Sequence, residues 1–221
     1  MDDQLTETER TRLHRKHERG HFDRTTINSI LDEAIHCTVA FAQDGRPFAI
    51  PMVFARIDND LYLHGAVANR MLTAMTRGAE ICVSVTLIDA LVLSRSLFRQ
   101  SVNYRCVMLF GVPDEVNDNP EKLRVLNAVV EHVIPGRSSD VRPPSRAELD
   151  ATRVMRLPIV EGSAKISTGG RDEAPNDVAL PIWAGRVPIR LVAGEPVPEN
   201  NLQPDIPTPG YATAYTRPSM T

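Results

Sequence analysis

The sequence has few cysteines and no long apolar run, and both absences restrict what the protein can be. Its three cysteines, Cys37, Cys82 and Cys106, are odd in number and widely spaced, and each lies in an apolar stretch. This pattern argues against a disulfide framework and favours reduced, buried thiols. No stretch is long and apolar enough to span a membrane, and residues 1–21 are polar, without a signal-peptide core. We therefore expect a cytoplasmic protein that does not enter a membrane.

The sequence also lacks an excess of charge of one sign. It has 25 lysine and arginine residues against 28 aspartate and glutamate residues, which gives a net charge of -3. A protein devoted to nucleic acid or to an anionic membrane surface is therefore not expected. Hydrophobic residues make up 42% of the 221 residues, enough for a sizeable core. Any anionic ligand must be held by a local cluster of basic side chains.

The order of the sequence patterns predicts a mainly β fold with flanking helices. Runs of β-forming residues follow one another with short turns between them, which favours an antiparallel barrel over a doubly wound α/β fold. Asp44 and Gly45 form a strong hairpin signal, and Pro51 implies an edge position or a bulge, because proline donates no backbone hydrogen bond. The strands are expected at residues 36–43, 48–57, 61–65, 80–88, 91–97, 104–116 and 152–167.

Apolar residues at helical spacing, together with capping signals, predict the helices. Asp23 suits the N-cap of one helix, and Pro120 suits the first turn of another. The helices are expected at residues 5–20, 24–34, 69–78, 120–134 and 143–151. We divide the chain into an N-terminal helical segment (1–22), a barrel domain (23–193) and a proline-rich tail (194–221). The prolines of the tail exclude the interiors of helices and sheets, so we expect it to be extended or disordered.

The stretch LYLHGAVANRM, residues 61–71, has the features of an anion site. It reads as a strand that ends at His64 and Gly65, followed by a helix that Asn69 can cap. A helix N-terminus attracts anions, and an arginine in the first turn can fork onto phosphate oxygens. Arg70 stands at that position, and Gly65 lets the backbone approach a ligand closely. The alternative is plain architecture, since a strand that ends in His-Gly before a short helix is common.

A wider series of motifs resembles a known family. HERGHFD, ILDEA, VAFAQDGRPFAIPMVFAR, LYLHGAVANRM, VNYRCVMLFG and SAKISTGGRDEAPNDVALPIWAGRVP occur in this order. Together they are similar to the pyridoxamine-phosphate-oxidase-related, flavin-nucleotide-binding proteins, including the nitroimidazole-resistance (Nim-type) branch. The resemblance covers residues 18–188. It implies a split β-barrel that forms a homodimer and holds FMN in clefts at the subunit interface.

The resemblance also implies which residues hold the cofactor. The strand over residues 50–56 would lie along the flavin, and the turn after His64 would meet the phosphate and the ribityl chain. In relatives of the oxidase a late tryptophan reaches the flavin from the other subunit, and Trp183 matches it. The implied cofactor-binding residues are Pro51, Met52, Val53, Phe54, Arg56, His64, Gly65, Asn69, Arg70, Tyr104, Arg105, Lys165 and Trp183.

The sequence departs from the family pattern at two places. A lysine that touches phosphate follows the arginine in the oxidase, whereas Met71 stands there in this chain. Arg56 or Lys165 would have to compensate for the missing charge. Residues 166–170, ISTGG, lack the basic residue that relatives often carry. The substrate-phosphate residues of the true oxidase are not recognisable either, which argues against vitamin B6 oxidation.

The function we expect is that of an FMN-dependent oxidoreductase, similar to a nitroreductase, that acts on a small electron-poor substrate. The flavin would supply the redox chemistry. His64 is the candidate catalytic residue, and both His64 and Arg105 are candidates to stabilise the reduced flavin. A second hypothesis is a non-catalytic module that binds a flavin or haem for storage, sensing or transfer, with His64 as the axial ligand of haem. A third is a homodimer without cofactor.

An arginine cluster and a histidine motif can each be interpreted either as a structural feature or as a functional site. Arg95, Arg99 and Arg105 surround a polar stretch, and they either form a loop or dimer contact or recognise the polar edge of the flavin or a substrate carboxylate. The motif HRKHERGH, residues 14–21, places three histidines at helical spacing. No carboxylate or cysteine completes a ligand set there, so we interpret it as a solvated basic face and expect no metal site.

Overall fold

The hairpin predicted at Asp44 and Gly45 is present in the computed structural model, which describes residues 3–217. Strand β2 (His36–Gln43) pairs with β3 (Arg46–Ile57), and β3 turns back into β4 (Asp60–Ala66). Asp44 and Gly45 have φ angles of 51° and 71°, as a two-residue turn between twisted strands requires. The predicted order of the first three strands is confirmed.

Strand β3 changes partner halfway along its length. Residues 46–53 pair with β2, whereas residues 54–57 pair with β4. Pro51 lies opposite Thr38 in the half that has a partner on one side only. Its missing N–H therefore leaves no gap in a ladder, and the predicted edge position of Pro51 is confirmed.

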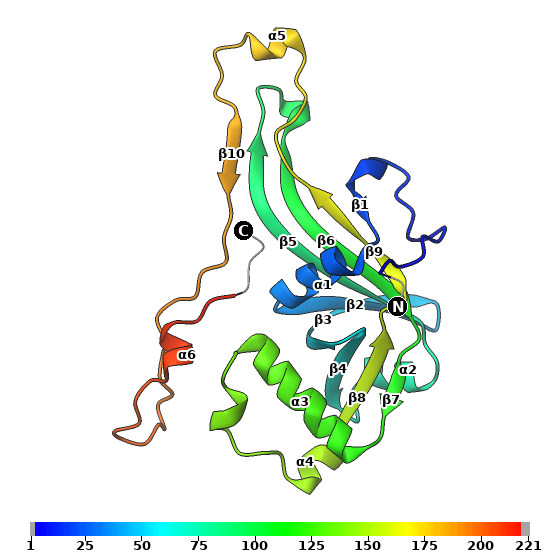
Figure 1. Ribbon diagram of the computed structural model, residues 1–221, viewed down its shortest axis with the longest axis vertical. Helices are drawn as coiled ribbons and strands as arrows, with labels where there is room; N and C mark the ends of the chain where they lie inside the picture. The colour runs from blue at the N-terminus through cyan, green and yellow to red at the C-terminus, as the bar shows by residue number, and fades with distance from the viewer. Residues whose placement is uncertain (1–2, 218–221) are drawn as a thin grey trace.

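The whole sheet has ten strands and is antiparallel at every pairing (Figure 1). The pairing order is β1-β9-β6-β5-β2-β3-β4-β8-β7, and β10 pairs with β5 off this path. The predicted mainly β fold, a split barrel with flanking helices, is confirmed. The remaining strands are β1 (Gly20–His21), β5 (Ile81–Leu93), β6 (Ser101–Gly111), β7 (Asp114–Val116), β8 (Thr152–Pro158), β9 (Glu161–Ser167) and β10 (Gly185–Pro188).

Two helices cover opposite sides of the sheet. Helix α1 (Arg24–Glu33) begins where Asp23 accepts a hydrogen bond of 2.7 Å from the Thr26 amide, and it buries its apolar side in the main core. Helix α3 (Asn119–Val133) packs Val125 and Val129 onto a second, smaller cluster over β3, β4 and β8. The other helices are η1 (His17–Arg19), α2 (Arg70–Thr76), η2 (Leu97–Arg99), η3 (Ser138–Asp140), α4 (Arg146–Asp150), α5 (Pro175–Val178) and α6 (Gly210–Thr213). Among residues 3–217, no helix has the length and apolar character needed to cross a bilayer.

The predicted helix over residues 5–20 is wrong. The segment consists of turns and bends, and only η1 is helical. Arg10 forms a hydrogen-bonded ion pair with Glu161 at 2.6 Å, while Leu5 is buried in the main core. The segment therefore follows the edge of β9, and contacts with residues far along the chain outweigh a weak local preference for helix.

Several strand predictions also need correction. The one strand expected at residues 104–116 forms two, because β6 ends at Gly111 and β7 pairs with β8. The two strands expected at residues 80–88 and 91–97 are joined in the single strand β5, which ends at Leu93 and has an irregularity between Ile88 and Ala90. The one strand expected at residues 152–167 forms two, because β8 pairs with β4 and β9 pairs with β6. Residues 168–190, for which the sequence predicts no strand, contain β10, which pairs with the end of β5.

The predicted tail is extended over most of its length but is not separate from the barrel. It leaves β10, passes along the left of the molecule in Figure 1 and returns through α6 to the helices. The Tyr215 hydroxyl donates to the Val133 carbonyl, and the Arg217 guanidinium donates to carbonyls at the C-terminal end of α1. Residues 218–221 of the predicted tail and residues 1–2 of the predicted N-terminal segment lie outside the described residues.

Arg105 joins α1 to the long strands β5 and β6. Its guanidinium donates to Glu33 at 2.5 and 2.8 Å and to Asp89 at 2.7 Å. The side chains of Arg105 and Glu33 are only 12% and 14% exposed. Asp89 occupies the irregularity of β5, so the break in register presents a carboxylate to the arginine.

Replacing Arg105 with leucine should destabilise the protein by about 3 kcal/mol, because it leaves two carboxylates without their cation in a half-buried site. Arg124→Leu breaks an exposed ion pair with Glu121 and should cost less than about 1 kcal/mol. Urea unfolding followed by circular dichroism measures both. Equal costs for the two variants would contradict the structural role assigned to Arg105.

Candidate functional site

The candidate site lies where β3 and β4 separate. Residues 64–66 of β4 still pair with β8, but their neighbours on the other side are absent because β3 pairs with β2 at that level. The chain then turns and enters α2. The stretch singled out in the sequence therefore occupies a place where one strand edge has no partner among residues 3–217.

His64 presents an imidazole without a hydrogen bond at this place. Its side chain is partly buried, Nδ1 is shielded from solvent, and neither ring nitrogen has a hydrogen-bond partner within the described chain. Burial lowers the pKa of His64 below its usual value, because the charged form loses hydration. At neutral pH the ring is neutral and has a nitrogen available to accept a hydrogen bond or to bind a metal.

Asn69 and Gly65 fix the start of α2 beside the strand. The Asn69 side-chain oxygen accepts hydrogen bonds from the Met71 and Leu72 amides at 2.9 and 3.2 Å. A Cβ at Gly65 would lie 3.1 Å from a Leu72 methyl group, so glycine permits the close approach. The predicted N-cap is confirmed, and it uses the two amides that an anion at the helix terminus would otherwise bind.

Arg70 is left as the anion-binding group of this turn. Its guanidinium carbon lies 4.1 Å above the centre of the Phe48 ring, and Phe48 stacks on Phe41 with ring centres 5.2 Å apart. No carboxylate within residues 3–217 pairs with Arg70. A guanidinium that stacks by its face keeps its N–H groups at the edge free for an oxyanion.

The predicted residues of β3 divide between the core and the surface. Phe54 is fully buried, whereas Pro51 and Val53 are exposed, as the alternation of a strand requires. Met52 is partly buried and packs against the core. Arg56 binds both oxygens of Asp32, at 2.8 and 2.6 Å, so it is already neutralised. It is therefore a poor replacement for the phosphate lysine, whose position is occupied by the buried Met71.

The other predicted site residues lie on strands that are not adjacent to β4 in the sheet. Tyr104 and Arg105 lie on β6 and Lys165 lies on β9, which β5, β2 and β3 separate from β4 in the pairing order. Arg105 is bound to two carboxylates, as described above. Trp183 is 66% exposed and lies beside Gly185 at the start of β10.

Arg153 is a residue of the site that the sequence did not reveal. It pairs with Glu115 at 2.9 Å and donates to the Val67 carbonyl at 2.8 Å and to the Thr73 hydroxyl at 3.1 Å. It therefore ties the turn between β4 and α2 to β7 and β8. An arginine in a strand pattern carries no signal of this role, because its partners lie far away in the sequence.

The cysteines and the histidine motif add no metal centre to the site. Cys37, Cys82 and Cys106 are free, and burial raises the pKa of Cys37 to about 12. Within the part of the chain that the structure describes, no group of three or more histidine, cysteine or acidic side chains could hold a metal ion. Of the histidines in residues 14–21, His14 lies in a bend, His17 in η1 and His21 in β1.

The fold and the sequence match known proteins over most of their length. A family model described as pyridoxamine 5'-phosphate oxidase matches residues 23–166. The flavocytochrome Anf3 from Azotobacter vinelandii is 35% identical, with 93% of this chain and 95% of that chain covered and a TM-score of 0.87. The FAD and haem binding protein from Mycobacterium smegmatis is 34% identical, with 90% and 98% covered and a TM-score of 0.86.

A protein from Bacteroides thetaiotaomicron described as a 5-nitroimidazole antibiotic resistance protein is also similar. It is 23% identical, with 70% of this chain and 95% of that chain covered and a TM-score of 0.56. At this identity the likeness concerns the fold alone. A search of curated protein sequences gave no match.

The lowered pKa of His64 predicts a dependence of stability on pH. The unfolded chain binds a proton at His64 near pH 6.5, whereas the folded chain resists it, so stability should fall as the pH drops from about 6.5 towards the folded pKa. The His64→Gln variant should lose less stability than the parent between pH 7.5 and pH 5.5 in urea unfolding. Burial also lowers the pKa of His132, so His132→Gln gives a matched comparison. An unchanged pH dependence in His64→Gln would contradict the assignment.

Proposed function

The chain belongs to the pyridoxamine 5'-phosphate oxidase family, and on that basis we propose that it binds a flavin and a haem and works as a redox protein. The observation that carries the proposal is the similarity to two proteins whose names describe both groups. One is a flavocytochrome and the other an FAD and haem binding protein, each 34% identical or more over at least 90% of this chain.

The form of the flavin follows from the choice of relative. The family resemblance predicts FMN, whereas the protein from Mycobacterium smegmatis binds FAD according to its description. We take FAD as the expected form, because that protein matches 90% of this chain, which extends beyond residues 23–166. FMN is the competing form, and the mass of the released flavin distinguishes the two.

The residues at the turn after β4 fit a flavin phosphate. Arg70 has no acidic partner within the described residues and offers the edge of its guanidinium. Gly65 removes a side chain from the approach, and Asn69 holds the turn rigid through its two hydrogen bonds. Arg153 fixes the same turn from β8. The chain's contribution is thus to position and neutralise the phosphate, while the bound flavin supplies hydride or electron transfer.

His64 is the histidine that best fits a redox group. A histidine that binds haem iron must be neutral and have a free nitrogen, and the lowered pKa of His64 keeps it neutral. His132 is less suitable, because its Nε2 lies 2.6 Å from the Ala34 carbonyl oxygen. We assign His64 to direct contact with a bound group, which would be either the haem or the flavin.

Turnover is a further part of the proposal. A flavin and a haem together can accept electrons in pairs and release them singly, which supports an oxidoreductase that acts on a small electron-poor molecule. The alternative is a module that stores or transfers the bound groups without turnover. Reduction of the bound chromophores by a reduced nicotinamide, followed by oxidation on adding substrate, favours the enzyme.

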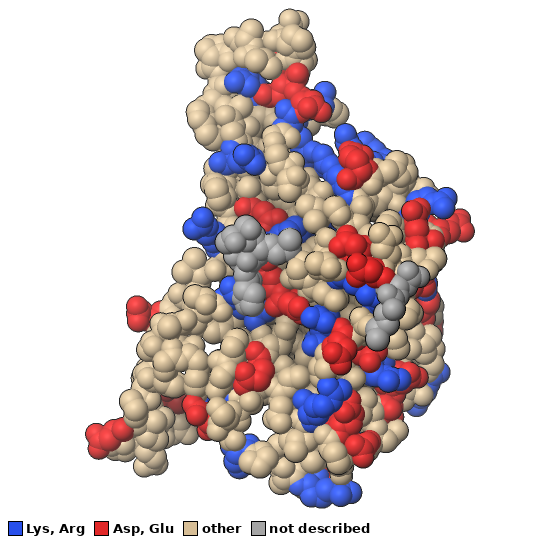
Figure 2. All heavy atoms as spheres, in the orientation of Figure 1, with Lys and Arg blue, Asp and Glu red and all other residues tan. Residues whose placement is uncertain are grey.

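We also propose that the protein forms a homodimer with the cofactors at the interface, in the cytoplasm and without nucleic acid or membrane as a partner. We call the projection formed by the end of β5, the start of β6 and residues 168–188 the arm (Figure 1). The arm and the tail support this arrangement, since they are mostly uncharged in Figure 2 and expose many large apolar side chains. Surfaces of this kind are rare on monomers and mark interfaces. The most exposed examples are Leu97 at 93%, Phe98 at 87%, Val197 at 89%, Val192 at 79% and Leu191 at 78%.

An absorption spectrum of the purified protein tests the proposal. We expect flavin bands and a haem Soret band, and replacing His64 with alanine should remove at least one of them without loss of fold. Loss of the Soret band would identify His64 as a haem ligand, and loss of flavin would identify a flavin contact. His14→Ala, in an exposed turn, is the matched control and should keep both. A colourless parent that also ignores added flavin and haem would refute the function.

Arg70→Gln should weaken flavin binding by about ten- to a hundredfold, because it removes a charge-assisted hydrogen bond to phosphate. Arg77→Gln, at the exposed end of the same helix, should leave the affinity unchanged. Titration of the flavin-free protein, followed by flavin fluorescence, measures both. Equal affinities for Arg70→Gln and the parent would remove Arg70 from the site.

A further inference from the structure

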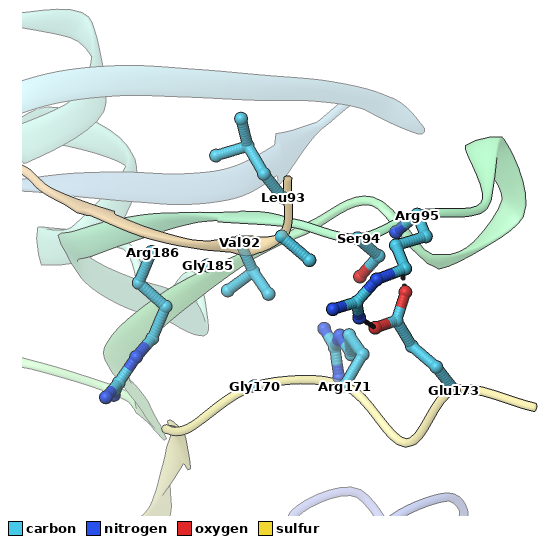
Figure 3. A pocket seen from close by; sticks show the side chains of 10 residues that line it. Val92, Leu93, Ser94, Arg95, Gly170, Arg171, Glu173, Gly185 and Arg186 are labelled. Carbon is cyan, nitrogen blue, oxygen red and sulfur yellow. Dashed lines mark hydrogen bonds and ion pairs between the residues drawn. The ribbon is translucent and has the colours of Figure 1, made fainter. Parts of the chain in front are cut away.

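A cavity of about 340 Å³ lies near the tip of the arm, away from the candidate flavin site. Three segments form it: the end of β5 with Arg95, the loop that carries Arg171 and Glu173, and the start of β10 with Gly185 and Arg186 (Figure 3). None of its lining residues comes from β3, β4 or α2. Its volume is that of a small-molecule site.

Basic side chains outnumber acidic ones in this cavity. Three of the lining residues are arginines, and Glu173 is the only acidic one. Glu173 is already engaged, because it accepts hydrogen bonds from the Arg95 guanidinium at 2.6 Å and from the Arg95 amide at 2.5 Å. Arg171 donates to the neutral Ser101 hydroxyl, and no carboxylate in the described chain pairs with it. The cavity therefore carries an uncompensated positive charge.

The arrangement of two arginines indicates where an anion would lie. In Figure 3 the guanidinium groups of Arg95 and Arg171 point towards one another beside Glu173, while Arg186 points away. The Arg95 Nε is shielded from solvent and has no hydrogen-bond partner within residues 3–217. Two like charges that converge repel one another, and an oxyanion between them would remove the repulsion and accept from the donors left over.

We propose that this cavity binds the oxyanion group of a small ligand, a phosphate or a carboxylate, between Arg95 and Arg171. Val92 and Leu93 supply apolar surface to the rest of the ligand. The same chemistry could belong to a free metabolite or to the acidic group of a bound cofactor.

Trp183 provides a built-in reporter of binding. A Cβ on Gly185 would lie 2.7 Å from the Trp183 ring, so the ring packs directly against a residue that lines the cavity. It is the single tryptophan of the chain, and its emission comes from this place alone. A ligand that enters the cavity changes the surroundings of the ring.

Calorimetric titration of the purified protein with inorganic phosphate, at constant ionic strength, tests the proposal. We expect saturable binding with a change in Trp183 emission, and Arg171→Gln should weaken it at least tenfold. Arg171 is the residue to change, because Arg95→Gln would also leave Glu173 unpaired. Arg46→Gln, in the exposed β2–β3 hairpin, is the matched control and should bind like the parent.

The chromophore content of the same variants identifies the source of the oxyanion. Weaker phosphate binding with full flavin and haem content assigns the site to a free ligand. Lower flavin or haem content in Arg171→Gln, with no phosphate binding by the parent, assigns it to the acidic group of that cofactor. If Arg171→Gln matches Arg46→Gln in both measurements, the proposal is wrong. The phosphate titration can be carried out even if the parent protein holds no flavin or haem. The proposed oxyanion site can therefore be confirmed or refuted independently of the proposed function.

Discussion

The rest of the structure depends on the change of partner within β3. A strand has two edges. One edge of β3 pairs with β2 as far as Val53, and the other edge pairs with β4 from Phe54 onward. The two halves of the sheet therefore part at this point, with Phe54 buried between them and its ring 4.8 Å from that of His132. The parting leaves the end of β4 without a neighbour on one side. Because of this feature the His64 ring has no hydrogen-bond partner, and a ligand can reach the turn that leads to Arg70.

Sequence reasoning was accurate where the cause lies within a few residues. The cap at Asp23, the turn at Asp44 and the cap at Asn69 depend on local hydrogen bonds and φ angles, and each is present as predicted. It was wrong where the local structure depends on contacts with residues far away in the sequence. Residues 5–20 follow β9 because Glu161 holds Arg10, and residues 152–167 break into two strands because their partners lie on different sides of the barrel. In the candidate site the sequence located the turn from His64 to Arg70, whereas the role of Arg153 depends on residues that only the fold brings near.

The arginines illustrate the same limit. Arg95, Arg99 and Arg105 are close in sequence and were grouped together. The structure separates them, because Arg105 is neutralised by Glu33 and Asp89 while Arg95 joins Arg171 in a cavity with one carboxylate. Whether a guanidinium stabilises the fold or is available to bind a ligand depends on the number of carboxylates close enough to pair with it. That number is a property of the folded chain.

The pairing of the N-terminal segment with β9 also determines when the fold can close during synthesis. Gly20 and His21 pair with Lys165 and Ala164, so residues 20–21 leave the ribosome long before their partner strand β9 does. At ordinary rates of translation this interval is on the order of ten seconds, far longer than helix or hairpin formation takes. Throughout it Leu5 has no completed core to enter. Residues 5–21 of a nascent chain are thus exposed to chaperones and proteases until β9 has been made.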